Sequence, residues 1–337
     1  MSDSGSVIRS RQRGGYRPAL PIRLGPLHQR PLRILALTKW MFGFPGYLWP
    51  WQAFFIGAAA LSWYFLTPDL EKMKDFSINW LGVLLIRNCT ILIVFTGLWH
   101  LRLYVQKAQG VDYKYNSRWL SADDPTFLFR NQLRDNIFWN VFSAVPIWTV
   151  YEAVTYWLQE NGRAPTVTWH AHPMYFVLLA ALTPTWLNIH FYFTHRLLHW
   201  APLYKAVHSI HHKNINFGPW SGLAMHPIEH LVYFSAIALY WLVPAHPLHA
   251  IFLLQQVALG PTLTHHGFGR LSLGTTYSLN TDHYMHYLHH KYVKVNFSTD
   301  IGLVPLDKWF GTFYDGSDEA HAALKKRSRI ERSEVTK

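Results

Sequence analysis

The sequence predicts an all-α transmembrane protein with about four full membrane-spanning helices, a short hairpin pair and a cytosolic, histidine-rich helical cap. Half of its 337 residues are hydrophobic and 16% are aromatic. Only 15% are charged, against roughly 25% in soluble domains. The apolar residues also form runs that match a bilayer core of about 30 Å, so composition and pattern both indicate a membrane protein.

Four apolar runs are long enough to be full spans, and each carries aromatic residues near its ends, as membrane interfaces favour. They occupy residues 49–67, 80–101, 136–158 and 174–189. Two shorter runs, 231–243 and 248–264, are separated only by residues 244–247. This short separation predicts a tight hairpin or a pair of re-entrant helices.

The distribution of Lys and Arg predicts the orientation of the spans. Eight of these residues precede the first span and six follow the second, whereas the loop after the first has two and the loop after the third has one. Basic loops stay cytosolic, so we expect both termini in the cytosol and a multi-pass protein of the endoplasmic reticulum or a bacterial inner membrane. The net charge of +12 then reflects contact with the bilayer and its anionic lipids, and no nucleic-acid partner is expected.

These patterns divide the chain into four parts. We expect a basic tail at 1–45, a transmembrane region at 46–187, a histidine-rich domain at 188–315 and a second basic tail at 316–337. The first residues lack the apolar core and cleavage site of a secretory signal, so we expect them to remain in the mature protein. Residues 1–15 and 328–337 have the composition of disordered tails. The single cysteine, Cys89, allows no disulfide framework.

Histidines are concentrated in one part of the chain. Sixteen of the 21 lie between His190 and His290. Residues three or four apart share a helix face, so each tight cluster is expected to present its imidazoles to one point. The three tight clusters are His195 with His199, His208 with His211 and His212, and His286 with His289 and His290.

The number of imidazoles predicts a binuclear metal site. Eight to ten rings are too many for one ion of four to six ligands, whereas two ions with four or five each would use them well. The ligand type alone leaves zinc, copper, iron and nickel open. Five further histidines are open between ligand, supporting partner and simple structure: His190, His226, His230, His266 and His283. The isolated ones are expected to be structural: His28, His100, His170, His172, His246, His249 and His321.

The motifs, in this order, resemble the membrane-bound fatty acid hydroxylase and sterol desaturase superfamily over residues 188–315. The matching elements are Tyr192-Phe-Thr-His195-Arg196-Leu-Leu-His199, His208-Ser-Ile-His211-His212, His226-Pro227-Ile-Glu229, His265-His-Gly267-Phe268, His286-Tyr-Leu-His289-His290, Asn296-Phe-Ser and Leu306-Asp307-Lys-Trp309-Phe310-Gly311-Thr312. Three departures leave the subfamily open: Asn188 replaces a frequent aspartate, Asn296-Phe-Ser replaces Asn-Tyr-Gly, and Asp307 precedes Trp309 by two.

The resemblance implies a centre of two iron ions that uses O2 as co-substrate. It assigns nine metal ligands: His195, His199, His208, His211, His212, His265, His286, His289 and His290. Further ligands or supporting partners are His226, Glu229, His230 and His283. The expected partners are a lipid substrate and an electron donor such as cytochrome b5 or a ferredoxin with its reductase.

The predicted function is a membrane di-iron oxygenase that hydroxylates a C–H bond of a sterol, sphingoid or fatty acyl lipid. Desaturation of a lipid or sterol is the nearest alternative, because removal of a second hydrogen gives a double bond. A histidine-lined metal transporter is an alternative of another class, and it requires ligands spread through successive spans. A structural protein would need a lost ligand, and zinc hydrolases use three protein ligands with an open position.

Overall fold

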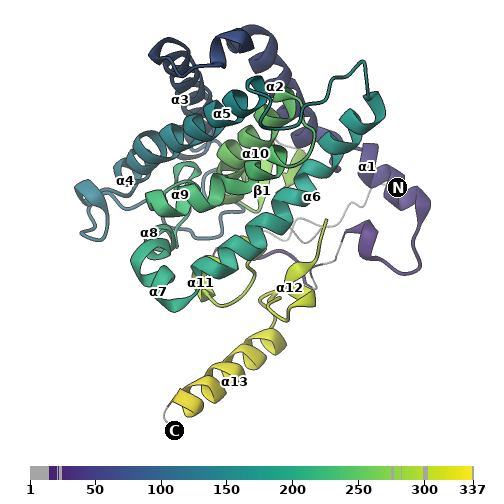
Figure 1. Ribbon diagram of the computed structural model, residues 1–337. Coiled ribbons are helices and arrows are strands. Elements are labelled where there is room, and N and C mark those ends of the chain that lie inside the picture. The colour runs from purple at the N-terminus through teal and green to yellow at the C-terminus, as the bar shows by residue number, and fades with distance from the viewer. Residues whose placement is uncertain are drawn as a thin grey trace.

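The computed structural model describes residues 15–20, 22, 25–274, 277–281, 283–298 and 303–335, with side chains given up to residue 327. The fold is helical (Figure 1), as the sequence predicts. Its longer helices are α1 (Ile34–Phe42), α2 (Ala53–Leu66), α3 (Ile78–His100), α4 (Gln132–Trp139), α5 (Val145–Glu160), α6 (Pro173–Leu198), α9 (Pro227–Phe234), α10 (Pro247–His265), α11 (Tyr284–Tyr292) and α13 (Asp318–Val335). Short helices are α7 (Ala201–Leu203), α8 (Ser209–His212) and α12 (Leu306–Trp309).

Three helical stretches in the described residues are long and apolar enough to cross a membrane: Ile78–Val105, Gln132–Glu160 and Pro173–Leu198. They correspond to the second, third and fourth expected spans. The first expected span, 49–67, differs, because α2 has only 14 residues. Trp49 precedes a proline and takes extended backbone angles (φ −110°, ψ 137°), so a continuous helix cannot run through it.

The expected hairpin pair forms around residues 242–246. Its first arm is α9 followed by a 3₁₀ turn, Ser235–Trp241, and its second arm is α10. Sixteen of the 19 residues of α10 are buried, and the helix packs against α2, α3, α5 and α6. Figure 1 shows α10 at the centre of the molecule. The apolar run at 248–264 therefore marks the core of the protein, and its neighbours are other helices.

A buried ion pair joins α3 to α5. The Arg87 guanidinium contacts the Glu152 carboxylate, and both side chains are almost fully buried. Asn88 Nδ2 donates to Glu152 Oε2 at 3.0 Å, and the Tyr156 hydroxyl donates to Oε1 at 2.6 Å. Arg87 also donates to Thr67 Oγ1 at 3.0 Å. A charge at this depth is costly without partners, so the network fixes which faces of the two helices meet.

Two features depart from the sequence prediction. A small antiparallel hairpin of β1 (Arg270–Leu273) and β2 (Tyr277–Asn280) follows α10, with Arg270 opposite Asn280. Residues 328–335, expected to be a disordered tail, continue helix α13, which is rich in Ala, Glu, Lys and Arg and so has high helix propensity. The rest of the predicted tails, residues 1–14, 336 and 337, lies outside the described residues.

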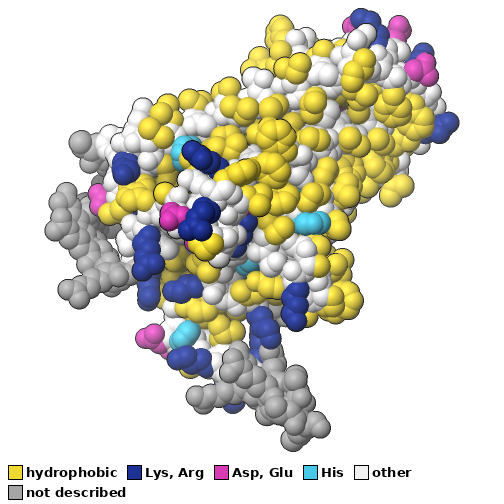
Figure 2. All heavy atoms as spheres, turned by 90° about the vertical axis from the view of Figure 1, so that its left-hand side faces the viewer, with side chains coloured by type: hydrophobic (Ala, Val, Ile, Leu, Met, Phe, Trp, Pro, Cys, Tyr) yellow, Lys and Arg dark blue, Asp and Glu magenta, His cyan; other side chains and the backbone are white. Residues whose placement is uncertain are grey.

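The surface separates apolar from basic regions. Figure 2 shows hydrophobic side chains covering much of one face, while Lys and Arg side chains gather mainly toward its lower part. Exposed hydrophobic residues are frequent on the candidate spans, including Ile86, Val94 and Leu98 of α3. Such a continuous apolar surface is typical of a membrane protein.

Candidate metal centre

The nine motif histidines meet in two adjacent groups. The five-histidine group consists of His195, His199, His208, His212 and His289. The four-histidine group consists of His211, His265, His286 and His290. Within each group the potential ligand atoms all lie within 4.8 Å of one another. Eight of the nine side chains are buried, and His199 is half-buried.

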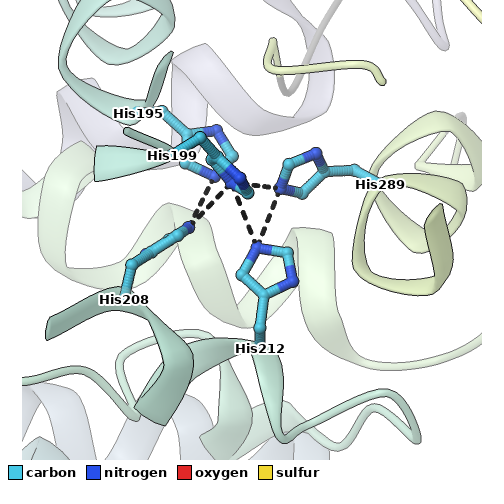
Figure 3. Close-up of side chains that lie close together, drawn as sticks. All are labelled: His195, His199, His208, His212 and His289. Atoms are coloured by element: carbon cyan, nitrogen blue, oxygen red, sulfur yellow. Dashed lines mark hydrogen bonds between the residues drawn. The ribbon is translucent and has the colours of Figure 1, made fainter. Parts of the chain in front are cut away.

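The ring nitrogens of the five-histidine group point toward one another (Figure 3). The His199 Nε2 atom lies 3.1 Å from that of His289 and 3.2 Å from that of His212. The His195 and His208 Nε2 atoms are 3.1 Å apart. Two nitrogens bound to one ion at about 2.1 Å, roughly 90° apart, would lie about 3.0 Å from each other. The arrangement therefore fits a shared cation.

The four-histidine group has a looser version of the same arrangement. The His286 and His265 Nε2 atoms are 2.9 Å apart, and those of His265 and His290 are 3.4 Å apart. The two groups also touch, because the His212 and His290 rings stack with centroids 4.5 Å apart. Two cations held in these groups would be close neighbours.

The sequence spacing of histidines that share a group is narrower than expected, because only residues four apart lie together and not those three apart. Each tight cluster was expected to serve one point, but His208 and His211 belong to different groups, as do His286 and His289. The pairs that share a group are four residues apart, such as His208 with His212 and His286 with His290. Positions i and i+4 of a helix are separated by about 40° around the axis, whereas i and i+3 diverge by about 60° to the other side. The extra histidine in each of the two three-histidine clusters, His211 and His289, therefore reaches the neighbouring group, whereas His195 and His199 share one group as expected.

Backbone carbonyls orient several of the rings. His195 Nδ1 donates to the Phe297 carbonyl at 2.7 Å, and His289 Nδ1 donates to the Val295 carbonyl at 2.6 Å. In the four-histidine group, His265 Nδ1 donates to the Pro261 carbonyl at 3.0 Å. A proton on Nδ1 leaves the Nε2 lone pair free for a metal. Metal-binding histidines usually donate their other ring N–H to a carbonyl or carboxylate in this way.

Glu229 supports the five-histidine group from outside. Its Oε1 atom lies 2.7 Å from His208 Nδ1, and both side chains are almost fully buried. Burial raises the pKa of Glu229 well above its usual range and lowers the pKa of His208 well below its own. A cation at His208 Nε2 would favour a carboxylate at Glu229 with the His208 N–H donor beside it.

The segment 295–298 is held in place by Asp307. The two Asp307 carboxylate oxygens accept hydrogen bonds from the Phe297 and Ser298 amides, each at 2.8 Å. Thr312 Oγ1 donates to the same carboxylate at 2.6 Å. Since the Phe297 carbonyl orients His195, the motif residues Asp307 and Thr312 act on the centre through the backbone.

The other histidines considered from sequence lie outside both groups. His230 pairs with Ser143 Oγ and the Leu223 carbonyl, and His190 pairs with Ser235 Oγ. His226 caps α9 by accepting from the Ile228 amide. The remaining two, His266 and His283, pack near each other with ring centroids 6.3 Å apart. These contacts are structural, so the expected extra ligands His226, His230 and His283 are not gathered with the nine.

The electrostatics of the centre favour neutral rings. Burial, reinforced by neighbouring imidazoles, lowers the pKa of His199, His211, His212, His286, His289 and His290 well below the ordinary value. Burial also lowers the pKa of His265 to about 3. Metal ligation requires unprotonated imidazole, so these nitrogens are available to cations at neutral pH.

Comparison with known proteins tests the resemblance to a known family. The sequence profile named fatty acid hydroxylase matches residues 179–312, a segment that contains all nine grouped histidines. The chain is also similar to curated sterol desaturases, described below. These matches support the fatty acid hydroxylase and sterol desaturase superfamily that the sequence motifs resemble. The predicted resemblance is therefore confirmed.

Relatives within this superfamily are named for sterol oxidation. The chain is 27% identical to a Delta(7)-sterol 5(6)-desaturase of Candida glabrata over 249 residues, covering 70% of this chain and 66% of the relative. It is 28% identical to a Delta(7)-sterol 5(6)-desaturase of Aspergillus fumigatus over 50% of this chain and 52% of the relative. A segment of 22 residues, 6% of this chain and 7% of the relative, is 73% identical to a methylsterol monooxygenase of the same species. The chain thus spans less than two thirds of these relatives, and no solved structure matches it.

A cavity of about 200 Å³ adjoins the centre. Three rings of the four-histidine group line it: His211, His265 and His286. No ring of the five-histidine group does so among the described residues. Apolar residues make up most of the remaining wall, including Phe55, Leu187, Phe191, Met225 and Val257. No sequence pattern indicates this cavity, because its walls come from segments that are far apart in the chain, among them α2, α6, α9 and α10.

Proposed function

We propose that this protein is an integral membrane di-iron oxidoreductase that uses O2 to oxidise a C–H bond of a sterol-type lipid. The observation that carries the proposal is the meeting of nine imidazoles in two adjacent groups, one of which opens into an apolar cavity. The superfamily and the names of the relatives support oxidative lipid chemistry.

In this proposal the five-histidine group holds one iron and the four-histidine group holds the other. Two bound irons would supply the redox chemistry that activates dioxygen and removes hydrogen from an unactivated carbon. The protein holds the rings at fixed angles through the Phe297, Val295 and Pro261 carbonyls. Glu229 balances charge beside His208. The group with four rings leaves more coordination positions for small ligands than the group with five.

The cavity is the proposed lipid site. Its walls are mainly apolar with a few polar groups, which is the lining typical of a site for an apolar ligand. The apolar side chains of Phe191, Met225 and Val257 line the cavity beside the four-histidine group, which favours a lipid segment over a solvated substrate. A lipid lying in the cavity would bring one of its carbons to His211, His265 and His286.

The electron donor is proposed to approach from the opposite side, at His199. This ring is half-buried, and Tyr204 packs against it with centroids 5.4 Å apart. Exposed Lys205 and Arg196 lie next to these rings in the sequence, and no acidic residue occurs between Glu160 and Glu229. A basic surface suits an acidic carrier such as cytochrome b5 or a ferredoxin.

The proposed topology is multi-pass with cytosolic termini, because Lys and Arg follow the positive-inside pattern. Under this topology the histidine groups lie at the cytosolic end of α6, and residues 188–315 form the catalytic unit between the transmembrane region and the C-terminal tail. The endoplasmic reticulum or a bacterial inner membrane would provide the lipid.

Lipid analysis with isotopically labelled oxygen tests the proposal. The iron-loaded protein is incubated in membranes with a sterol mixture, a reduced carrier and ¹⁸O₂, and products are identified by mass spectrometry. Oxidised sterol that depends on iron and on His289 supports the function. Absence of any oxidised lipid with an intact two-iron centre would refute it.

Hydroxylation and desaturation are both retained as outcomes. Hydroxylation is the first candidate from the sequence, whereas the names of two relatives favour desaturation. The same labelled experiment separates them, because a hydroxylated product carries ¹⁸O and a desaturated product has lost two hydrogens without gaining oxygen.

A further inference from the structure

The lipid cavity contains a polar side chain without a hydrogen-bond partner. Gln256 belongs to α10 and lines the cavity together with Pro184 and Ala236. Its side chain is only 9% exposed, and its Nε2 atom has no hydrogen-bond partner among the described residues. A buried amide in an apolar wall is unfavourable unless something else satisfies it.

The neighbouring glutamine of this helix uses its amide N–H differently. Gln255 is 1% exposed, and its Nε2 atom donates to Ser62 Oγ of α2 at 2.8 Å. Gln255 does not line the cavity. The two amides therefore differ in role: Gln255 joins two helices, whereas Gln256 faces the space that a ligand would fill.

We infer that Gln256 is the residue that recognises a polar oxygen of the lipid substrate. Its amide N–H would donate to a lipid hydroxyl or carbonyl oxygen, and its amide oxygen could accept the proton of a hydroxyl. The inferred ligand class is thus an apolar lipid with a single oxygen function. This inference rests on the proposed function, since it assumes that the cavity holds the substrate.

The position of Gln256 would also set the register of the lipid. Gln256 lies nine residues before His265 on α10, which is about 14 Å along the helix at about 1.5 Å per residue. A lipid anchored at Gln256 would extend along the cavity toward the four-histidine group. Gln256 is then a positioning residue that acts on the choice of carbon, at a distance from the metals.

Binding to the metal-free protein tests the inference without turnover. Wild type, Gln256→Leu and Gln255→Leu are purified in nanodiscs, and their affinities are measured for pairs of lipids that differ only in a hydroxyl: cholesterol against cholest-5-ene, and octadecanol against octadecane. For at least one pair, wild type should prefer the hydroxyl member by about tenfold, the usual worth of one hydrogen bond. Gln256→Leu should bring that ratio close to one.

The control variant separates recognition from folding. Gln255→Leu breaks a helix–helix hydrogen bond, so it should lower thermal stability while leaving the preference for the hydroxyl member unchanged. Gln256→Asn, which keeps an amide, should retain part of the preference and reports on specificity if the leucine variant does not fold. Equal binding of both members of every pair by wild type, or an unchanged ratio in Gln256→Leu, would overturn the inference. Because no metal or O2 is involved, these results stand whether or not the protein proves to be an oxygenase.

Discussion

His289 and His290 are consecutive residues of α11, yet their imidazoles belong to different histidine groups, with ring planes 86° apart and centroids 5.7 Å apart. His211 and His212 show the same division on α8. Each pair of consecutive histidines therefore supplies one ring to each group. The two groups share the helices α8 and α11, so they form one centre rather than two separate sites.

Removing one ring of the pair should remove one ion. We expect His289→Ala and His290→Ala each to lower the iron content of anaerobically loaded protein from about two per chain to about one, because each ring belongs to a different group. Elemental analysis with Mössbauer spectroscopy measures this. His226→Ala, which lies outside both groups, should keep about two irons. Two irons retained in either variant would contradict the assignment of that ring.

Glu229 should matter for metal affinity although it contributes no atom to either group. Glu229→Gln removes the charge beside His208 while keeping the shape, and loss of such a partner typically lowers metal affinity by about 10–100-fold. Competition with a chelator of known affinity measures the change. Glu319→Gln, an exposed carboxylate on α13, is the matched control and should bind metal like wild type. An affinity for Glu229→Gln within twofold of wild type would rule out the supporting role.

Asp307 should link the folding of the 295–298 segment to the centre. Asp307→Asn weakens the hydrogen bonds to the Phe297 and Ser298 amides, and we expect a loss of about 1–3 kcal/mol in the free energy of unfolding. Asp123→Asn breaks only the exposed ion pair with Arg130 and should cost less than about 1 kcal/mol. Unfolding monitored by tryptophan fluorescence compares the two variants. Equal losses of unfolding free energy would argue against the stabilising role of the Asp307 hydrogen bonds.

Removing one partner of the buried pair Arg87–Glu152 should destabilise the fold strongly, whereas replacing both partners by apolar residues should destabilise it little. Glu152→Gln leaves the Arg87 charge without its counterion, for which we expect a loss of about 3–5 kcal/mol in the free energy of unfolding. The double variant Arg87→Met with Glu152→Leu removes both charges and should recover most of this loss. A double variant that is less stable than the single one would mean that the pair contributes net stability.

The metal-free protein should lose stability in mild acid. Burial lowers the pKa of His230 and of His266 to about 3, whereas an unfolded histidine titrates near about pH 6.5. The unfolded chain then binds protons that the folded chain does not, so stability is complete above pH 6.5 and falls as the pH drops toward 3. Between these two pKa values, each such residue lowers the free energy of unfolding by up to about 1.4 kcal/mol for each unit by which the pH falls.

Denaturation at about pH 7.5 and about pH 5 measures this dependence. His230→Asn, which removes one of the titrating rings, should reduce the slope between these values. A slope that is the same in wild type and in this variant would show that His230 does not drive the acid sensitivity.

The sequence predicted more of the centre than of its surroundings. The eight histidines singled out by spacing, and His265, which the resemblance added, all lie in the two groups. The spacing is informative because i to i+4 geometry is a local property that a sequence displays directly. The assignment of rings to groups was not predictable in the same way, since His208 and His211 lie on one short turn and still diverge. Whether these rings bind iron remains a prediction.

The fold was predictable where a span is continuous and less so elsewhere. The helices at Ile78–Val105, Gln132–Glu160 and Pro173–Leu198 follow from length and apolar composition. Hydropathy could not reveal that α10 is surrounded by other helices, because a core helix and a lipid-facing helix have the same apolar composition. Gln256 was missed for the same reason: its role depends on walls contributed by distant segments.

The division of neighbouring histidines between two groups limits how this gene can change in length. Within 286–290 a single inserted residue would turn every later ring by about 100° around the helix axis, so the ring would no longer point into its own histidine group. The stretch between His265 and His286 holds the β1–β2 hairpin and contributes no ring to either group, so a change of length at the turn of this hairpin leaves the spacing inside every cluster unchanged. Natural insertions and deletions are therefore expected between the clusters and excluded inside them.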